Sequence, residues 1–103
     1  MSNIEKARRE GMRWNIINAL NKARPYTTSE KFLLDIMKGI YPDATALELR
    51  QHLDYLHDCK LLVITKEPSG LWFVDLTRSG VDTAEYTIEC QAGIARPTKY
   101  WEV

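Results

Sequence analysis

The sequence predicts an α+β domain in which three helices precede a two-stranded β-hairpin, a short fourth helix and a C-terminal tail. Apolar residues between positions 46 and 56 recur at the spacing of one helix face. Two later runs, LLVIT at 61–65 and LWFVDL at 71–76, are rich in the β-branched and aromatic residues typical of strands. Pro68 and Gly70 lie between these runs and favour a tight turn. The predicted fold is therefore organised around a helix that leads directly into a hairpin.

Length and composition indicate one globular domain. A chain of 103 residues can bury a single core without disulfide or metal support. No run approaches the roughly 18 apolar residues of a transmembrane helix, and the N-terminal residues MSNIEKARRE lack the apolar stretch of a signal peptide. We therefore expect a cytoplasmic protein with no membrane partner, in which Cys59 and Cys90 are reduced thiols.

Charge is unevenly distributed, although the chain is neutral overall. Residues 1–24 carry a net charge of +4, whereas residues 25–60 and 61–103 each carry −2. The basic charge is thus concentrated in the first predicted helix. Such a helix can serve the phosphate groups of a nucleic acid, and the alternative is an ordinary solvated helix face.

The first helix is predicted to begin at a capping box, Ser2-x-x-Glu5, and to run to about Ala23, ahead of a proline. Its main apolar stripe consists of Met12, Ile16, Ala19, Leu20 and Ala23. Trp14 and Ile17 lie on a different side of the helix, about 140–200° from the first residue of that stripe. A helix that is apolar on two sides is either covered by later parts of the chain or packed against another copy.

The second helix is predicted to begin at another capping box, Thr27-x-x-Glu30, and to continue through about Gly39. Its broad apolar face consists of Phe32, Leu33, Ile36, Met37 and Ile40. The sequence Tyr-Pro-Asp at 41–43 then favours a turn.

The third helix is predicted to begin at Thr45, with Glu48 completing a capping box. In this motif the threonine hydroxyl accepts from a first-turn N–H, while the glutamate reaches back to the capping residue. The residues facing the core are Leu49, Leu53 and Leu56. The outward face then carries Leu47, Gln51, Asp54 and Asp58. This outward face is acidic.

The hairpin alternates, with Leu62 and Ile64 on one face of the first strand. The corresponding residues of the return strand are Trp72, Val74 and Leu76. Thr77 can cap a short fourth helix that ends at about Tyr86. We therefore expect a domain at 1–86 and a tail at 87–103 that docks on the domain or on a partner subunit, because an unstructured tail rarely carries residues such as Ile94 and Trp101.

No enzymatic site is evident. The five glycines are scattered rather than gathered in a phosphate-binding loop. His52 and His57 lie five residues apart, about 140° around a helix, so they cannot share a metal ion on one face. We expect no catalytic residues, no metal, no cofactor and no small-molecule substrate.

The predicted order of elements is that of a winged helix-turn-helix: two helices, a turn, a third helix and a hairpin. The segments TALELRQHLDYLHDCKLL and WFVDLTRSG, within residues 27–80, resemble the passage from recognition helix to strand and the end of the wing in the winged-helix superfamily of bacterial and phage regulators. The whole chain, with GIARPTKYW at 93–101, is similar to small winged-helix proteins of Mu-like prophages. The resemblance implies a cytoplasmic, phage-derived protein that binds DNA or regulates transcription. The acidic outward face of the third helix departs from a typical DNA-reading pattern.

Two functions follow as expectations. The first is a regulator that binds double-stranded DNA, with Arg50 suited to guanine and Gln51 to adenine. The residues predicted to contact DNA are Thr45, Arg50, Gln51, Lys66, Arg8, Arg9 and Arg13. The second is a protein-interaction or dimerisation module without direct DNA readout, whose interface, to a second copy or another protein, consists of Trp14, Ile17, Tyr100 and Trp101.

Overall fold

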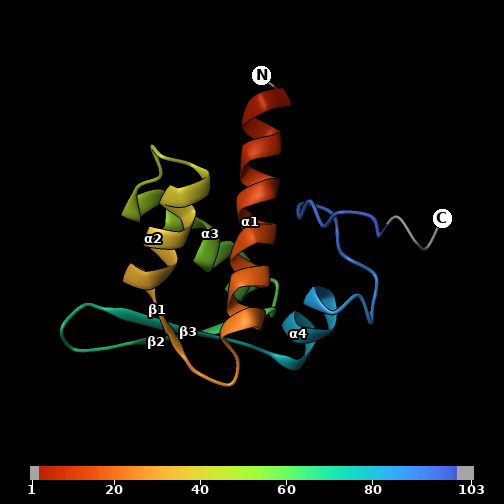
Figure 1. Cartoon of the computed structure of the whole chain (residues 1–103). Coiled ribbons are helices and arrows are strands. Elements are labelled where there is room, and N and C mark those ends of the chain that lie inside the picture. Colours follow the sequence, from red (N-terminus) through yellow and green to blue (C-terminus); the bar gives the residue numbers. More distant parts are fainter. Residues whose placement is uncertain (1–2, 100–103) are drawn as a thin grey trace.

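The computed structural model describes residues 3–99, and in this part of the chain four helices accompany a three-stranded antiparallel sheet (Figure 1). The elements are α1 (Asn3–Ala23), β1 (Thr28–Ser29), α2 (Glu30–Ile40), α3 (Ala46–Asp58), β2 (Leu62–Lys66), β3 (Trp72–Leu76) and α4 (Arg78–Ala84). The predicted α+β class is confirmed. The three long helices lie on one face of the sheet, and the β2–β3 hairpin extends beyond them.

The sheet contains one strand that the sequence did not predict. Its order is β1-β3-β2, and the hairpin pairs Leu62 with Leu76 and Lys66 with Trp72, as expected for a tight turn. The additional strand, β1, pairs Thr28 with Val74. With two residues, β1 is too short to show the alternation by which strands are recognised.

The predicted start of the second helix is wrong. Ser29 is the N-cap of α2, and its hydroxyl accepts from the Phe32 N–H at 3.2 Å. Thr27 instead donates its hydroxyl to the Asp75 carboxylate at 2.8 Å. Because Thr28 and Ser29 are paired with β3, their backbone is extended and the helix begins only after them.

The core lies between α1, α2, α3 and the inner face of the sheet. The predicted stripes of α1 and α3 contribute to it, together with inward residues of α2 and the hairpin. Its fully buried members are Met12, Ile16, Ile17, Leu33, Met37, Leu49, Leu53, Leu56, Leu62 and Val74. For the second apolar side of α1, two alternatives were open, cover by later parts of the chain or packing on another copy. Ile17 is fully buried within one chain, so the first alternative holds at this residue and its assignment to an interface is wrong. Trp14 is half-buried there and meets the Tyr86 ring edge-on, with centroids 6.0 Å apart.

The short helix α4 fixes the chain after the hairpin. Thr77 is its N-cap, as predicted, and accepts from the Gly80 N–H at 3.1 Å, although the helix ends at Ala84 rather than near Tyr86. Gly80 allows α4 to approach the loop before β2 closely. A Cβ at this position would lie only 2.0 Å from the Leu61 carbonyl oxygen.

Residues 87–99 lie against α1 and α4 (Figure 1). The Ala95 N–H donates to the Glu10 carbonyl of α1 at 3.1 Å, and Ile94 is 7% exposed. Arg96 donates to the carbonyls of Thr83 and Ile88 at 3.0 and 2.8 Å. The described part of the tail is therefore bound within the same chain. Tyr100 and Trp101, which were assigned to an interface, lie outside the described residues.

Candidate nucleic-acid interface

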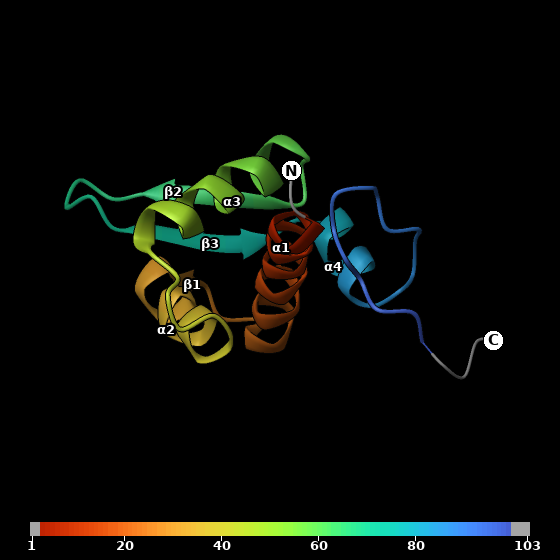
Figure 2. The same ribbon diagram turned by 90° about the horizontal axis from the view of Figure 1, so that it is seen from above.

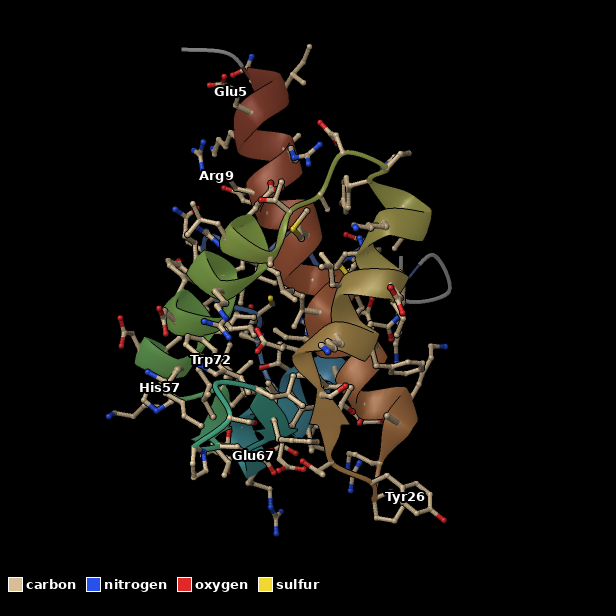
Figure 3. All side chains as sticks on the ribbon, turned by 90° about the vertical axis from the view of Figure 1, so that its left-hand side faces the viewer. Glu5, Arg9, Tyr26, His57, Glu67 and Trp72 are labelled. Carbon is tan, nitrogen blue, oxygen red and sulfur yellow. The ribbon has the colours of Figure 1, made fainter. Side chains whose placement is uncertain are left out.

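The outward face of α3 and the loop between β2 and β3 form one side of the molecule. Figure 3 views this side, with Glu67 in the loop and His57 near the C-terminal end of α3. Leu47 is 68% exposed, and Gln51 and Asp54 on the same face are also exposed. The outward face predicted from helical periodicity is therefore the exposed face of α3.

Arg50 joins α3 to both α2 and the hairpin. Its Nε and Nη2 donate to the two carboxylate oxygens of Glu30 at 2.7 and 2.6 Å, and Nη2 also donates to the Gly70 carbonyl at 2.8 Å. The guanidinium lies over the Trp72 ring, 4.3 Å from its centroid. A contact from Arg50 to a guanine would have to replace these bonds. Its geometry thus favours holding the helix against the hairpin.

Glu30 is the buried centre of this arrangement. It is 8% exposed, and it accepts from the Trp72 backbone N–H at 2.9 Å as well as from Arg50. The hydrogen bonds from Arg50 lower the pKa of Glu30, assisted by the Trp72 N–H and opposed by burial. Glu30 therefore remains an anion that ties α2 to β3 and α3.

Arg8 makes a second bidentate pair, at the start of α3. It donates to the two Glu48 oxygens at 2.8 and 2.9 Å, and its Nη1 lies 2.9 Å from Asp43. Thr45 caps α3 as predicted, accepting from the Glu48 N–H at 3.1 Å. The second half of that capping box is wrong: the Glu48 carboxylate turns to Arg8, because a charged bidentate pair is stronger than a bond to a neutral N–H. This pairing lowers the pKa of Glu48.

Arg13 faces inward. Its guanidinium stacks on the Tyr55 ring, 3.6 Å from the centroid, and its Nη1 donates to the Gly93 carbonyl of the tail at 3.0 Å. Its Nε donates to Nδ1 of His52 at 3.3 Å. Burial, and then the nearby Arg13 charge, lower the pKa of His52, so the imidazole is neutral and accepts this bond.

The residues predicted to contact DNA therefore divide into two groups. Arg8, Arg13 and Arg50 are bound within the chain, and the Thr45 hydroxyl is engaged as the N-cap of α3. Arg9 and Gln51 are exposed, and so is Lys66, whose ammonium lies 4.5 Å from the Trp72 centroid. Arg9 and Lys66 have no ion-pair partner within 4.0 Å among residues 3–99.

Sequence reasoning missed Lys31. It is exposed in the first turn of α2 and borders a hollow of about 480 Å³ between α2 and α3, together with Leu47 and Arg50. Lys31 directly follows Glu30 in the sequence, and Glu30 pairs with Arg50 of α3. The position of Lys31 beside α3 could therefore be predicted only by knowing that Glu30 and Arg50 meet.

Comparison with protein-family models, with curated proteins and with solved structures yields no match to this chain. Within residues 3–99, no group of three or more His, Cys, Asp or Glu side chains could hold a metal ion. No helix in the same range is long and apolar enough to cross a membrane.

Proposed function

We propose that the chain is a winged helix-turn-helix protein that binds double-stranded DNA, as a regulator of phage or bacterial type. The element order α1-β1-α2-α3-β2-β3 supports this, because α3 packs on the other helices and leaves one face exposed beside the hairpin. In helix-turn-helix proteins the corresponding helix enters the major groove and neighbouring elements contact the backbone.

The observation that carries the proposal is the exposed N-terminal half of α3. Leu47 and Gln51 are four residues apart, so they are neighbours on one helix face. An apolar side chain suits the thymine methyl group, and a glutamine amide suits the edge of adenine. Asp54 and Asp58 belong to the second half of the helix, so α3 enters the groove only by its first two turns.

Phosphate contacts come from the exposed cations around this face. Lys31 lies in the first turn of α2, Lys66 at the end of β2, and Arg9 on α1. Arg8, Arg13 and Arg50 have a different role, because each already holds two parts of the chain together. They position α3 and the tail.

The test is a salt titration of duplex binding, followed by fluorescence anisotropy with a labelled mixed-sequence duplex. The logarithm of the binding constant falls linearly with the logarithm of salt concentration, with a slope of about −0.9 for each phosphate contact. Binding that is undetectable at low salt, or insensitive to salt, contradicts the proposal.

The second candidate function is a protein-interaction or dimerisation module without DNA readout. The acidic second half of α3 favours it, because Asp54 and Asp58 repel phosphate. The exposed apolar side chains Phe32 and Ile40 on α2 also favour it, being 55% and 49% exposed. A chain that self-associates but shows no salt-dependent affinity for DNA would establish this second function.

A further inference from the structure

The outward side of α2 is apolar although its inward side already fills the core. Phe32, Ile36 and Ile40 follow one another at four-residue intervals, which places them on one face. Phe32 is 55% exposed, Ile40 is 49% exposed and Ile36 is half-buried. The inward side carries Leu33 and Met37, both fully buried. One of the two apolar sides of α2 thus lacks a cover among the described residues.

The surface around Phe32 combines a ridge with two hollows. Phe32 borders both hollows. One, of about 380 Å³, lies between α1 and α2 and is lined by Ala19, Ala23, Ile36 and Ile40 among others. The other, of about 530 Å³, is lined by Tyr26, Thr28 and Phe73 among others. A ridge beside a hollow is the shape that two identical surfaces need in order to fit each other about a two-fold axis.

Gly39 lies on the same outward face, in the last turn of α2. It is exposed, a Cβ there would meet nothing within 4 Å, and no positive φ requires glycine. Glycine weakens a helix relative to alanine. A glycine on an open helix face allows another backbone or ring to approach closely.

We infer that a second copy of this chain docks on this face, with α2 crossing its counterpart in antiparallel orientation about a two-fold axis between Asp35 and Ile36. At a rise of about 1.5 Å per residue, Phe32 and Gly39 each lie about 5 Å from that axis. The Phe32 ring of each copy therefore lies over Gly39 of the other and enters the hollow beside Ile40.

The charged residues beside this face favour a second copy of the chain as its partner. Asp35 and Lys38 are exposed on the same flank of α2. In the antiparallel crossing, Asp35 of one copy lies within about 3 Å, measured along the helix axis, of Lys38 of the other. The two-fold axis repeats this pair, so two ion pairs flank the apolar contact.

Docking on α2 leaves the exposed face of α3 open. Seen from above, α2 and α3 lie on opposite sides of β3 (Figure 2). The dimer therefore does not depend on DNA binding, and each copy still presents its α3.

The test is sedimentation velocity on the full chain over a wide range of concentration. The wild type is expected to dimerise. Gly39→Leu should weaken the dimer at least tenfold, because the new side chain occupies the space of the Phe32 ring, while leucine remains a good helix former. Phe32→Ala should also weaken it. Val63→Ala is the matched control and should leave self-association unchanged, because it removes a comparably exposed apolar side chain, 47% exposed, from β2.

A charge exchange tests the symmetry directly. Asp35→Lys and Lys38→Asp each place like charges opposite one another and should weaken self-association. An equimolar mixture of the two variants restores both ion pairs, so a heterodimer should form with near wild-type affinity. The inference is overturned by a chain that stays monomeric at all concentrations, by a dimer indifferent to Gly39→Leu and Phe32→Ala, or by a mixture that associates no better than its components.

Discussion

The Arg50 guanidinium donates from Nε and Nη2 to both oxygens of the nearly buried Glu30 carboxylate, at 2.7 and 2.6 Å. The pair joins the middle of α3 to the first turn of α2. Glu30 also accepts from the Trp72 N–H, and Arg50 also donates to the Gly70 carbonyl. The Arg50–Glu30 pair therefore fixes α3 relative to the hairpin. The surface proposed to bind DNA depends on this relationship for its shape.

Glu30→Gln should destabilise the chain by about 1–2 kcal/mol, since it removes the anion and leaves the Arg50 charge without its partner. The loss is no larger because Arg50 is 37% exposed and solvent screens its charge. Urea unfolding measures the change as a lower midpoint at unchanged slope. Asp54→Asn, an exposed carboxylate on α3, is the control and should change stability by less than about 0.5 kcal/mol. Equal midpoints for the two variants would refute this role for Glu30.

Stability should fall on acidification because His52 is held neutral in the folded chain. Its folded pKa is lowered by burial and by Arg13, Arg8 and Arg9, with Glu48 acting in the opposite direction. Below the unfolded pKa of about 6.5 the unfolded chain binds the extra proton, so stability is lost as pH falls from there towards the folded value. The steepest loss for one such group is about 1.4 kcal/mol per pH unit.

The check is urea unfolding at pH 7.5 and at about pH 5.5 for the wild type, His52→Gln and His57→Gln. His52→Gln keeps an acceptor for Arg13 and should flatten the pH dependence. His57→Gln changes an exposed histidine and should leave the dependence as in the wild type. Identical pH profiles for all three proteins would exclude His52 as the source.

Replacing Gly80 or Gly39 by alanine should change the stability of the fold in opposite directions. Gly80→Ala places a Cβ 2.0 Å from the Leu61 carbonyl oxygen, which is backbone and cannot turn aside, so we expect a loss of about 2 kcal/mol or more. Gly39→Ala meets open space and should raise stability by up to about 1 kcal/mol. Thermal unfolding at low protein concentration distinguishes them. A Gly80→Ala protein as stable as the wild type would mean that α4 can move away from Leu61.

The periodic helices and the hairpin could be predicted because their signals are local. β1 could not, because Thr28 pairs with Val74 far along the chain and two residues carry no alternation. The exposed face of α3 followed from helix geometry alone. The internal roles of Arg8 and Arg50 did not, because their partners lie 40 and 20 residues away in the sequence.

Each cation at the proposed interface should contribute independently to the slope of the binding constant against salt concentration on logarithmic scales. Lys31→Gln and Lys66→Gln should each reduce the magnitude of the slope by about 0.9, because each removes one phosphate contact. Arg78→Gln, which removes an exposed cation from α4, is the matched control and should leave the slope unchanged. If all three substitutions change the slope equally, the chain binds DNA by its general charge and not by this face.

The most direct measurement is the affinity of the wild-type chain for a mixed-sequence duplex as a function of salt. Lys31, Lys66 and Arg9 together predict a log–log slope of about −2.7, at about −0.9 for each contact. A measurable affinity that falls with this slope is the predicted result. An affinity that is absent at low salt, or that does not change as salt rises, would contradict DNA binding by this chain.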